Sequence, residues 1–449
     1  MKRIQAAITV FEFGYLGVGE KAKHSKRISR ISQSSFAYLK QLCLCDESES
    51  RFLTLKSIDN TEVLQLQNYA GVLFTPDGTQ IEVLPKIGRK LGGEDGQARA
   101  RNSLLNMLAT LGSFRHISTN SANLSKSRMP LLEVFISQFL DSVNVLIKKG
   151  LRSDYIGCEN NLSFLKGKLL VSKQLKKNSI NKHKFYVEHD EFVLDRPVNR
   201  LIHLALTKVS TYSSSAANQK LAKELLFAFT GIPLSTNVKN DLSAVKLDRG
   251  MNYYKEPFDW AKLILEGFSP LTMTGSSYAS SLLFPLETVF ESYVASILAT
   301  QIPKNMTLET QAKAESLVSF NKRKFFRLQP DLLITESRKR IVVLDTKWKL
   351  IDSRKDNGTD KFGLSQSDLY QMFAYGHKYL SGYGELFLIY PSHDDFIEPI
   401  EFPFAYSNEL KLWIIPFDVS DNVDDNKRLI FPSNSTFQTS TRVNKFTKM

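Results

Sequence analysis

Apolar and polar positions in the first hundred residues alternate over short stretches that are separated by turn residues. Between Glu62 and Gly88, two such apolar stretches flank Pro76-Asp77-Gly78. An Asp-Gly pair in this setting is a strong signal for a β-hairpin. We therefore predict a β-rich N-terminal domain over residues 1–125.

Farther along, apolar residues recur with the three- and four-residue spacing of an amphipathic helix. This spacing predicts helices at residues 97–112, 131–151, 199–212 and 219–232. Gly150 is suited to end the second of these helices, because glycine readily takes the left-handed conformation that follows many helices. We predict a mostly helical middle domain over residues 126–275.

From Leu286 onward, the pattern predicts a more specific order of elements, namely a helix, three strands, a helix and a strand. In chain order these are residues 286–298, 315–321, 331–335, 341–348, 365–380 and 385–391. They make up an expected domain over residues 276–420. The remaining residues, 421–449, are polar and weakly patterned, and we expect a frayed tail there.

Two aspartates mark the hairpin that is predicted within this last domain. Asp331 and Asp345 each lie seven residues from Arg338, the midpoint of the polar connection, so antiparallel pairing places them opposite each other. Facing carboxylates repel unless a cation or a proton lies between them. Lys347 has the same parity as Asp345 and projects from the same face. The set suits a hard cation such as Mg²⁺, and solvated strand ends are the alternative interpretation.

Charge adds a candidate nucleic-acid surface. The 449-residue chain has a formal net charge of +13, which favours polyanionic partners. Residues 160–187 contain seven lysines and no acidic residue. We predict DNA contact there, and a solvated basic face is the alternative. The candidate residues are Lys166, Lys168, Lys173, Lys176 and Lys177.

The cysteines and the hydropathy of the sequence indicate the cellular compartment of the protein. The three cysteines, Cys43, Cys45 and Cys158, do not form a disulfide framework or a zinc-ligand pattern. The sequence has no apolar stretch of membrane-spanning length. We expect a soluble, cytoplasmic protein that does not associate with membranes.

Two stretches imitate functional motifs without meeting their requirements. Gly14 to Glu20 is rich in glycine, but it lacks the spacing of a phosphate-binding loop, and we predict a flexible loop or interaction finger. Asp77, Glu82 and Lys86 resemble the carboxylate–lysine set, but Asp77 lies in the turn itself, where the strands diverge. We interpret this second stretch as structural or as a partner surface.

The last domain resembles the PD-(D/E)xK nuclease fold through Pro330-Asp331, Asp345-Thr346-Lys347 and the pair Gln371 and Tyr375 on one helical face. The Q-x-x-x-Y spacing is similar to that of RecB-type nucleases. Seven blocks from about residue 68 to 390 together resemble the McrC family, the nuclease subunits of McrBC-type modification-dependent restriction systems. They are NYAGVLFTPDGTQIEVLPKIG, GLRSDYIGCENNLSFLKGKLL, DRPVNRLI, VFESYV, RLQPDLLI, VLDTKWK and DLYQMFAYGHKY.

The resemblance implies a fold class and a metal site. The fold is an α+β multidomain protein with a β-rich N-terminal domain, a helical middle region and a C-terminal restriction-endonuclease-like α/β domain. Asp331, Asp345 and the carbonyl of Thr346 are expected to bind Mg²⁺, for which Mn²⁺ can substitute. Lys347 is the expected catalytic lysine.

The resemblance also implies roles for residues on the two helices. Glu291 lies where the first helix of the family supplies an additional acid for catalysis and metal binding, and Glu287 is the competing choice. Gln371 and Tyr375 are expected to orient the lysine, the scissile phosphate or the DNA backbone. Packing of both residues on the sheet is the alternative.

The function implied is Mg²⁺-dependent cleavage of double-stranded DNA together with an McrB-like AAA+ GTPase ring. The ring recognises modified cytosine, and the chain docks on it through its N-terminal region and stimulates GTP hydrolysis. A non-catalytic activator of the ring and a stand-alone RecB-like repair nuclease are the alternatives. The chain departs from the family by extra length in the N-terminal region, after Trp348 and in the tail, which affects the partner-facing details most.

Overall fold

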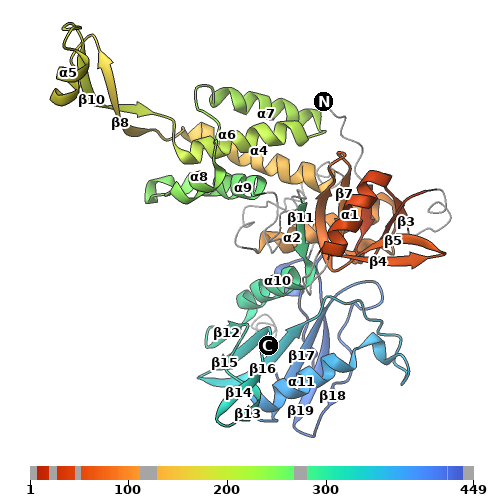
Figure 1. The fold of residues 1–449 in the computed structure, drawn as a ribbon. Helices are drawn as coiled ribbons and strands as arrows, with labels where there is room; N and C mark the ends of the chain where they lie inside the picture. Colours follow the sequence, from red (N-terminus) through yellow and green to blue (C-terminus); the bar gives the residue numbers. More distant parts are fainter. Residues whose placement is uncertain are drawn as a thin grey trace, which may run out of the picture. The chain divides into compact units, whose positions relative to one another are not determined.

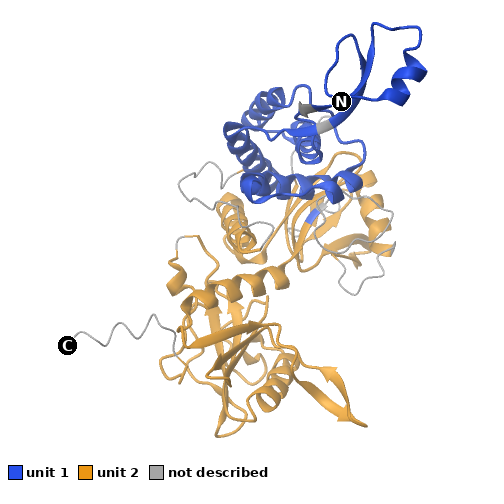
Figure 2. Ribbon diagram, turned by 90° about the vertical axis from the view of Figure 1, so that its left-hand side faces the viewer, with its two compact units in different colours: residues 1–4, 130–282 blue, residues 5–129, 283–449 orange. Residues whose placement is uncertain are grey.

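The computed structural model describes residues 8–19, 28–45, 52–111, 129–266, 281–421 and 423–437. The chain divides into two compact units, of which one contains residues 1–4 and 130–282 and the other residues 5–129 and 283–449 (Figure 2). The second and larger unit therefore joins the first part of the chain to the last part. None of the described helices is long and apolar enough to cross a membrane.

The N-terminal part of the larger unit contains two four-stranded sheets, with strand orders β1-β7-β6-β11 and β3-β2-β5-β4 (Figure 1). Their strands are β1 (Ile8–Phe11), β2 (Tyr15–Gly17), β3 (Ile28–Arg30), β4 (Leu53–Ile58), β5 (Thr61–Leu66), β6 (Tyr69–Phe74), β7 (Gln80–Leu84) and β11 (Ser281–Pro285). The helices of this part are α1 (Gln33–Cys45), the 3-10 turn η2 (Lys86–Gly88) and α2 (Gly93–Ala109).

Of two predictions for this part, the hairpin is confirmed and the glycine-rich loop is partly wrong. The hairpin around Asp77-Gly78 is confirmed as β6–β7, and its turn is closed by a hydrogen bond of 3.1 Å from Thr75 N to Thr79 O. The loop predicted from Gly14 to Glu20 is wrong for Tyr15–Gly17, which form β2 between β3 and β5. The short apolar Tyr-Leu pair gave no clear periodicity, and its partners lie far away in the sequence. Glu20 lies outside the described residues.

The described part of the smaller unit contains five α-helices that pack on one another and a projecting three-stranded sheet, β8-β10-β9 (Figure 1). The helices are α4 (Leu131–Lys149), α6 (Pro197–Tyr212), α7 (Ala216–Ala228), α8 (Val238–Ala244) and α9 (Lys255–Leu265), with the 3-10 turn η3 (Arg249–Tyr254) before α9. Gly150 ends α4 with φ 90°, as predicted.

The prediction of a mostly helical middle region is wrong for residues 154–193. There, β8 (Asp154–Leu162) and β10 (Phe185–Val193) pair over nine residues, and β9 (Lys168–Leu169) and a short helix, α5 (Val171–Lys177), lie at the far end of this ribbon (Figure 1). Because the ribbon is largely exposed, its strands lack the apolar alternation by which a half-buried strand is recognised in a sequence.

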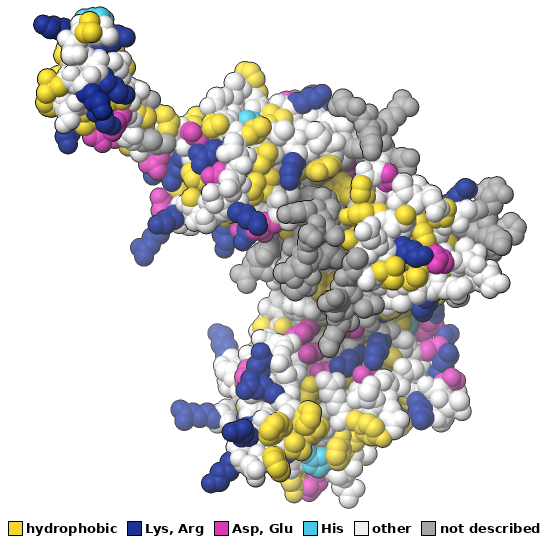
Figure 3. All heavy atoms as spheres, in the orientation of Figure 1, with side chains coloured by type: hydrophobic (Ala, Val, Ile, Leu, Met, Phe, Trp, Pro, Cys, Tyr) yellow, Lys and Arg dark blue, Asp and Glu magenta, His cyan; other side chains and the backbone are white. Residues whose placement is uncertain are grey.

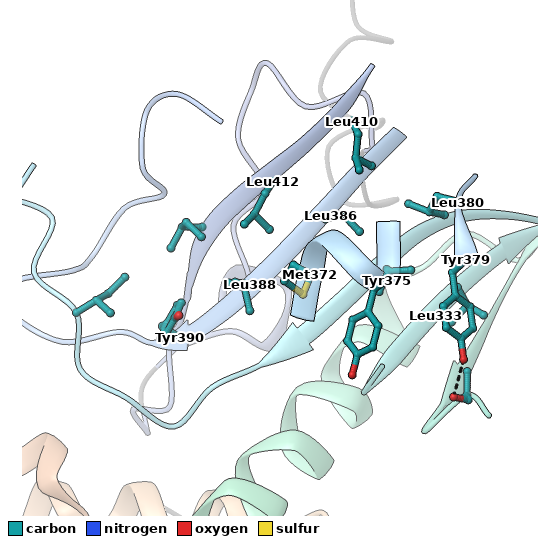
Figure 4. Close-up of a cluster of buried hydrophobic side chains, with 14 of the residues drawn as sticks. Leu333, Met372, Tyr375, Tyr379, Leu380, Leu386, Leu388, Tyr390, Leu410 and Leu412 are labelled. Carbon is teal, nitrogen blue, oxygen red and sulfur yellow. Dashed lines mark hydrogen bonds between the residues drawn. The ribbon is translucent and has the colours of Figure 1, made fainter. Parts of the chain in front are cut away.

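The C-terminal part of the larger unit is built on a six-stranded sheet of order β12-β15-β16-β17-β19-β18. Its elements are α10 (Leu286–Gln301), β12 (Met306–Thr310), β15 (Leu332–Glu336), β16 (Lys339–Thr346), the 3-10 turn η4 (Lys361–Gly363), α11 (Gln366–Tyr379), β17 (Gly384–Pro391), β18 (Phe404–Ala405) and β19 (Leu410–Phe417). The side chains of α11 pack on the sheet around Met372 and Leu388 (Figure 4).

The predicted order of helices and strands is confirmed for α10, β15, β16, α11 and β17, but the strand expected at residues 315–321 is misplaced. Those residues form β13 (Ser316–Phe320), which pairs with β14 (Arg323–Arg327) in a separate two-stranded sheet. The strand that pairs with β15 on the side away from β16 is β12, whose largely exposed edge position hid it in the sequence.

Part of the predicted polar tail is ordered, so fraying does not describe residues 423–437. The 3-10 turn η5 (Asp425–Lys427) lies here, followed by buried Leu429, Phe431 and Phe437. The buried carboxylate of Glu385 accepts hydrogen bonds from Ser435 Oγ at 2.8 Å and from Phe437 N at 3.1 Å. A sequence pattern cannot reveal this anchor, because Glu385 is 50 residues away from Ser435.

Candidate active site

The acids of the hairpin face each other because of an irregularity in its pairing. Near the turn at Ser337 and Arg338, Thr335 pairs with Arg340, but beyond a bulge Ile334 pairs with Val342. The extra residue, Ile341, shifts the register by one position. Leu332 therefore pairs with Leu344, and the next position along the same register places Asp331 opposite Asp345. The predicted pairing of the aspartates is thus correct at this end, although the turn itself is one residue shorter than expected.

The two aspartates have different surroundings. Asp331 Oδ2 accepts hydrogen bonds from the backbone N of Thr346 at 2.8 Å and from its Oγ1 at 2.7 Å. Asp345 is 1% exposed, and its Oδ2 lies 2.5 Å from Lys347 Nζ in an ion pair that lacks hydrogen-bond geometry. Burial and the neighbouring charge of Asp331 raise the pKa of Asp345 to about 7. Asp345 is therefore a buried acid with an incompletely satisfied oxygen.

Lys347 is held by a chain of hydrogen bonds that ends on the backbone. Its Nζ donates to Gln371 Oε1 at 3.0 Å, and Gln371 Nε2 donates to the hydroxyl of Tyr375 at 2.7 Å. That hydroxyl donates in turn to the carbonyl of Gln329 at 2.9 Å. Burial disfavours the charge of Lys347, but the combined attraction of Asp345, Asp331 and Asp368 outweighs this effect and raises the pKa of the lysine. The lysine is thus fixed as a cation beside the acids.

Of the two glutamates on α10, Glu291 lies in the stronger field of the hairpin acids. Burial and the charge of Asp331 raise the pKa of Glu291 to about 7. Its Oε1 accepts a hydrogen bond from Gln311 Nε2. Glu287 is exposed, and its Oε1 accepts a hydrogen bond of 3.2 Å from Asn68 Nδ2. This geometry favours Glu291 as the helix acid.

A cavity of about 360 Å³ collects these side chains. Its lining is Glu287, Thr288, Glu291, Asp331, Asp345, Thr346, Lys347, Trp348, Lys349, Asp368 and Gln371. Of the predicted catalytic residues, Tyr375 alone is outside this lining. Tyr375 contacts the lining through its hydrogen bond with Gln371. Sequence reasoning missed Lys349 and Asp368, whose side chains form an ion pair of 2.7 Å. The parity of Lys349 with Asp345 and Lys347 is the signal that could have identified the lysine.

The donor set suits a divalent cation, although the side chains do not surround one as they stand. Among the described residues, no three His, Cys, Asp or Glu side chains are grouped as they would be around a metal ion. However, the cavity is lined with carboxylate oxygens, the ligands that Mg²⁺ prefers. The carboxylate of Asp345 is buried, with Lys347 Nζ beside its Oδ2, and burial together with the charge of Asp331 raises the pKa of both Asp345 and Glu291. These residues therefore fit the ion that the sequence implies.

Trp348 ties the site to the N-terminal part of the same unit. Its ring nitrogen, Nε1, donates to the fully buried carboxylate of Glu12 at 3.0 and 3.1 Å. Lys86 Nζ lies 3.1 Å from Glu12 Oε1 and donates to the carbonyl of Trp348 at 2.8 Å. Sequence reasoning missed this network, because Glu12 and Trp348 are 336 positions apart.

The set around Asp77 that imitates the nuclease motif does not converge. Asp77 accepts hydrogen bonds from hydroxyl groups that include Ser34 and Thr75. Glu82 forms an ion pair of 2.7 Å with Arg101. Lys86 forms an ion pair with Glu12 and donates a hydrogen bond to the carbonyl of Trp348. The interpretation of these residues as structural is therefore confirmed.

The lysine-rich segment lies in the other unit, at the far end of the β8–β10 ribbon. All five candidate lysines are exposed: Lys166, Lys168, Lys173, Lys176 and Lys177. Lys173 forms an ion pair with Glu159, and Lys177 Nζ lies 4.8 Å from the ring centre of Tyr186. Exposed apolar side chains share the same end, with Leu175 71% and Ile180 91% exposed. The surface is therefore mixed in character and not purely basic.

Comparisons with known proteins agree on one family. The profile of the family described as McrBC 5-methylcytosine restriction system component matches residues 64–391. A chain in the half-complex from the tetradecameric assembly of Thermococcus gammatolerans McrB AAA+ hexamers with bound McrC is similar to 94% of this chain, over 98% of its own length, with 20% identity and a TM-score of 0.68. A chain of the Thermococcus gammatolerans McrBC complex covers 70% of this chain and 90% of its own, with 22% identity and a TM-score of 0.47. No curated protein matches. At 20% identity, the first likeness concerns the fold.

Proposed function

Because the chain belongs to the family of McrBC 5-methylcytosine restriction system components, we propose that it is the subunit that cuts DNA. The single observation that carries this proposal is the convergence of Asp331, Asp345 and Lys347, together with Glu291, on one cavity. A non-catalytic activator would have no use for a buried acid pair with an ion-paired lysine, because such a group is costly to maintain. We propose a PD-(D/E)xK nuclease site at this position.

In this mechanism, Asp331, Asp345 and the carbonyl of Thr346 would hold Mg²⁺, and Glu291 would contribute a further carboxylate beside them. A Mg²⁺ ion bound there would stabilise the negative charge that develops on the scissile phosphate. Lys347 presents its ammonium group to the reacting phosphate or to the attacking water. Gln371 and Tyr375 fix the direction of that ammonium group through their hydrogen bonds.

We further propose that the chain works with an McrB-like AAA+ GTPase ring and stimulates its GTP hydrolysis. The similar assembly from Thermococcus gammatolerans contains McrB hexamers with bound McrC. For this chain, the N-terminal region remains a predicted docking surface. Its Tyr15–Gly17 segment pairs within a sheet, so among the described residues of the Gly14–Glu20 stretch only Gly14, Val18 and Gly19 lie outside a strand.

A second surface is a better match for a protein partner, namely the end of the β8–β10 ribbon. We define this ribbon tip as residues 164–184. Its exposed apolar residues are Phe164, Leu165, Val171, Leu175 and Ile180. An apolar cluster rimmed by charges is typical of a protein-binding surface, and phosphate contacts by the lysines would not account for these apolar residues. We therefore propose ring contact for the ribbon tip, and DNA contact by its lysines remains the competing prediction.

Cleavage of methylated and unmethylated plasmids tests the proposed function. The full-length chain is assayed with Mg²⁺, with and without the ring protein and GTP, beside Asp345→Asn and a matched control, Asp356→Asn, at an exposed position outside the cavity. We expect wild type and the control to cut, and Asp345→Asn to lose cutting while GTP hydrolysis remains stimulated.

Other outcomes identify the alternatives. Cleavage by a folded Asp345→Asn protein contradicts the nuclease site. Stimulated GTP hydrolysis without cleavage of any plasmid by wild type indicates a non-catalytic activator. Equal cleavage in the absence of the ring indicates a stand-alone nuclease.

A further inference from the structure

The β13–β14 hairpin is an insertion whose two ends lie beside the acids. The chain leaves the main sheet after Gln311, whose backbone N bonds to the carbonyl of Asp331 at 2.8 Å, and it returns at Leu328, whose N bonds to the carbonyl of Glu315 at 3.0 Å. The residues between these points form the two strands. The insertion therefore starts and ends at the catalytic end of β15.

The root of this hairpin is fixed to the helix that orients Lys347. The hydroxyl of Tyr379 lies 3.0 Å from the carbonyl oxygens of both Ala312 and Leu328, and Tyr375 donates to the carbonyl of Gln329. Both tyrosines are labelled in Figure 4. Tyr375 and Tyr379 both lie on α11, one turn and two turns after Gln371. A ligand bound by the hairpin would thus have a defined position relative to Lys347 and the acids.

The hairpin itself displays apolar side chains to solvent. Every residue of β14 is exposed, and four of the five residues of β13 are exposed. The large apolar residues among them are Leu317, Val318, Phe320, Phe325 and Phe326. A two-stranded ribbon of this size is marginally stable by itself. Exposed phenylalanines do not add to its stability, so folding alone does not explain why they are present.

The backbone at the most exposed ring is strained. Phe326 is 74% exposed and has φ 54°, in the left-handed region that bulky residues rarely adopt. Strain of this kind gathers where a side chain is aimed at a ligand. The turn at Asn321 and Lys322 also has positive φ angles, which suit a tight two-residue hairpin. The result is a narrow ribbon with phenylalanines near its tip and its base.

The charge of the hairpin is strongly one-sided. From Ser316 to Pro330 the sequence has four basic residues and no acidic residue. The basic residues are Lys322, Arg323, Lys324 and Arg327. In Figure 3, dark-blue and yellow side chains lie close together over this lower part of the larger unit. A second copy of the same hairpin would bring like charges together, whereas a polyanion would neutralise them.

We propose that the β13–β14 hairpin is a DNA-binding wedge, in which the basic residues hold phosphates and Phe320 or Phe326 enters between base steps. Basic and aromatic side chains used in this way kink the duplex and hold it in place. The proposal rests on the proposed nuclease function and deepens it. Through its root, the wedge sets the scissile phosphate against Asp331 and Lys347.

The test separates the basic residues from the aromatic ones. Binding of a fluorescent duplex to the full-length chain is measured in Ca²⁺, which replaces Mg²⁺ to prevent cleavage, at several salt concentrations. The variants are Arg323→Gln with Lys324→Gln, and Phe320→Ala with Phe326→Ala. The matched controls are Lys411→Gln and Phe402→Ala, at exposed positions of the same unit.

We expect the basic pair to lower the slope of log K against log salt by about 2. The phenylalanine pair is expected to weaken binding about tenfold with an unchanged slope. It should also abolish the fluorescence rise of 2-aminopurine that reports unstacking of a base step. The controls are expected to behave like wild type, and melting temperatures confirm that all variants fold.

Several results would overturn the wedge. Unchanged DNA binding in both hairpin variants would do so, as would the absence of DNA binding by wild type with and without the ring protein. Loss of self-association in place of DNA binding would assign the hairpin to a second copy, and loss of GTPase stimulation alone would assign it to the ring. If Asp345→Asn abolishes cleavage while the hairpin variants bind DNA normally, the nuclease stands and the wedge alone fails.

Discussion

At the scale of single residues, burial and charge conflict at Asp345. Its carboxylate is buried beside Asp331, and Lys347 compensates only part of the resulting cost, since the pKa of Asp345 is raised to about 7. An aspartate in an unfolded chain titrates near 3.8. Between these pH values the folded chain binds more protons than the unfolded chain, so its stability falls as the pH rises through this window.

We therefore predict that Asp345→Asn changes the pH dependence of stability in the metal-free protein. Wild type loses stability between about pH 4 and 7 because of this group, on the order of 2–4 kcal/mol, and Asn cannot lose a proton. In EDTA, the melting temperature of the variant relative to wild type should thus increase from pH 5 to pH 8. The variant also lacks the ion pair with Lys347, which changes its melting temperature at every pH. The test is therefore how the difference in melting temperature between variant and wild type changes with pH. Parallel curves for the two proteins would show that Asp345 is not an elevated acid.

Tyr375 provides a second prediction at this scale. Tyr375→Phe removes the hydroxyl that accepts from Gln371 and donates to Gln329, so Gln371 loses its orientation and Lys347 loses its direction. We expect kcat for cleavage to fall about tenfold, with Mg²⁺ affinity unchanged. Tyr370→Phe, at an exposed position on the same helix, is the control and should retain full activity. A loss of Mg²⁺ affinity in Tyr375→Phe would instead mean that the tyrosine supports the acids.

The residues of the site could be predicted to the extent that they are close in sequence. Asp331, Asp345 and Lys347 fall on one hairpin, where period-two alternation and a turn determine their faces. The contact of Gln371 with Lys347 required the resemblance to a known family. Glu12 and Trp348 could not be paired at all, because their contact depends on how two sheets meet.

At the scale of elements, the network of Glu12, Lys86 and Trp348 holds β1, η2 and the end of β16 together. Burial raises the pKa of Glu12, although Lys86 and the hydrogen bond from Trp348 act to lower it. The ionised form of Glu12 is therefore destabilised at this position. Because Trp348 directly follows Lys347, the same contacts fix the backbone beside the proposed catalytic lysine. The N-terminal sheet is thus a support of the site.

We predict a strong coupling between Lys86 and Glu12 in unfolding experiments. Lys86→Met leaves the buried carboxylate without its counter-charge and is expected to cost about 3–5 kcal/mol. Adding Glu12→Gln should restore most of this loss, because the amide needs no counter-charge. Lys40→Met breaks a surface ion pair with Glu62 in the same sheet region and should cost at most about 1 kcal/mol. Urea unfolding of wild type, Lys86→Met, Glu12→Gln and the double variant measures the cycle, and additive effects of the two substitutions would contradict the coupling.

Elements were predictable where one face is buried, and not where both faces are exposed. The apolar runs of β15, β16 and α11 identify them directly. The β8–β10 ribbon and the edge strand β12 have little buried surface, so their sequences do not alternate clearly. The bulge at Ile341 was also invisible, although it sets the register on which the site depends.

At the scale of the whole molecule, the division of the chain differs from a simple order of domains. Residues 5–129 share a compact unit with residues 283–449, and the interior of that unit contains the Glu12–Trp348 contact. Deleting the first 125 residues would therefore remove part of the support of the proposed nuclease site together with any docking surface. A truncation of this kind cannot separate cleavage from partner contact, and substitutions at the ribbon tip can.

The last prediction uses the ribbon tip to separate ring contact from DNA contact. Leu175→Ser with Ile180→Ser removes two exposed apolar side chains, each worth about 1.5–3 kcal/mol when buried in an interface. If the tip binds the ring, the concentration of chain needed for half-maximal GTP turnover should rise at least tenfold, while the salt dependence of DNA binding stays unchanged. Phe227→Ser, at an exposed position on α7, is the matched control. If neutralising Lys173, Lys176 and Lys177 instead flattens the salt slope by about 3 and the apolar pair has no effect on GTP turnover, the tip is a DNA surface, because phosphate neutralisation needs the charges and not the apolar groups.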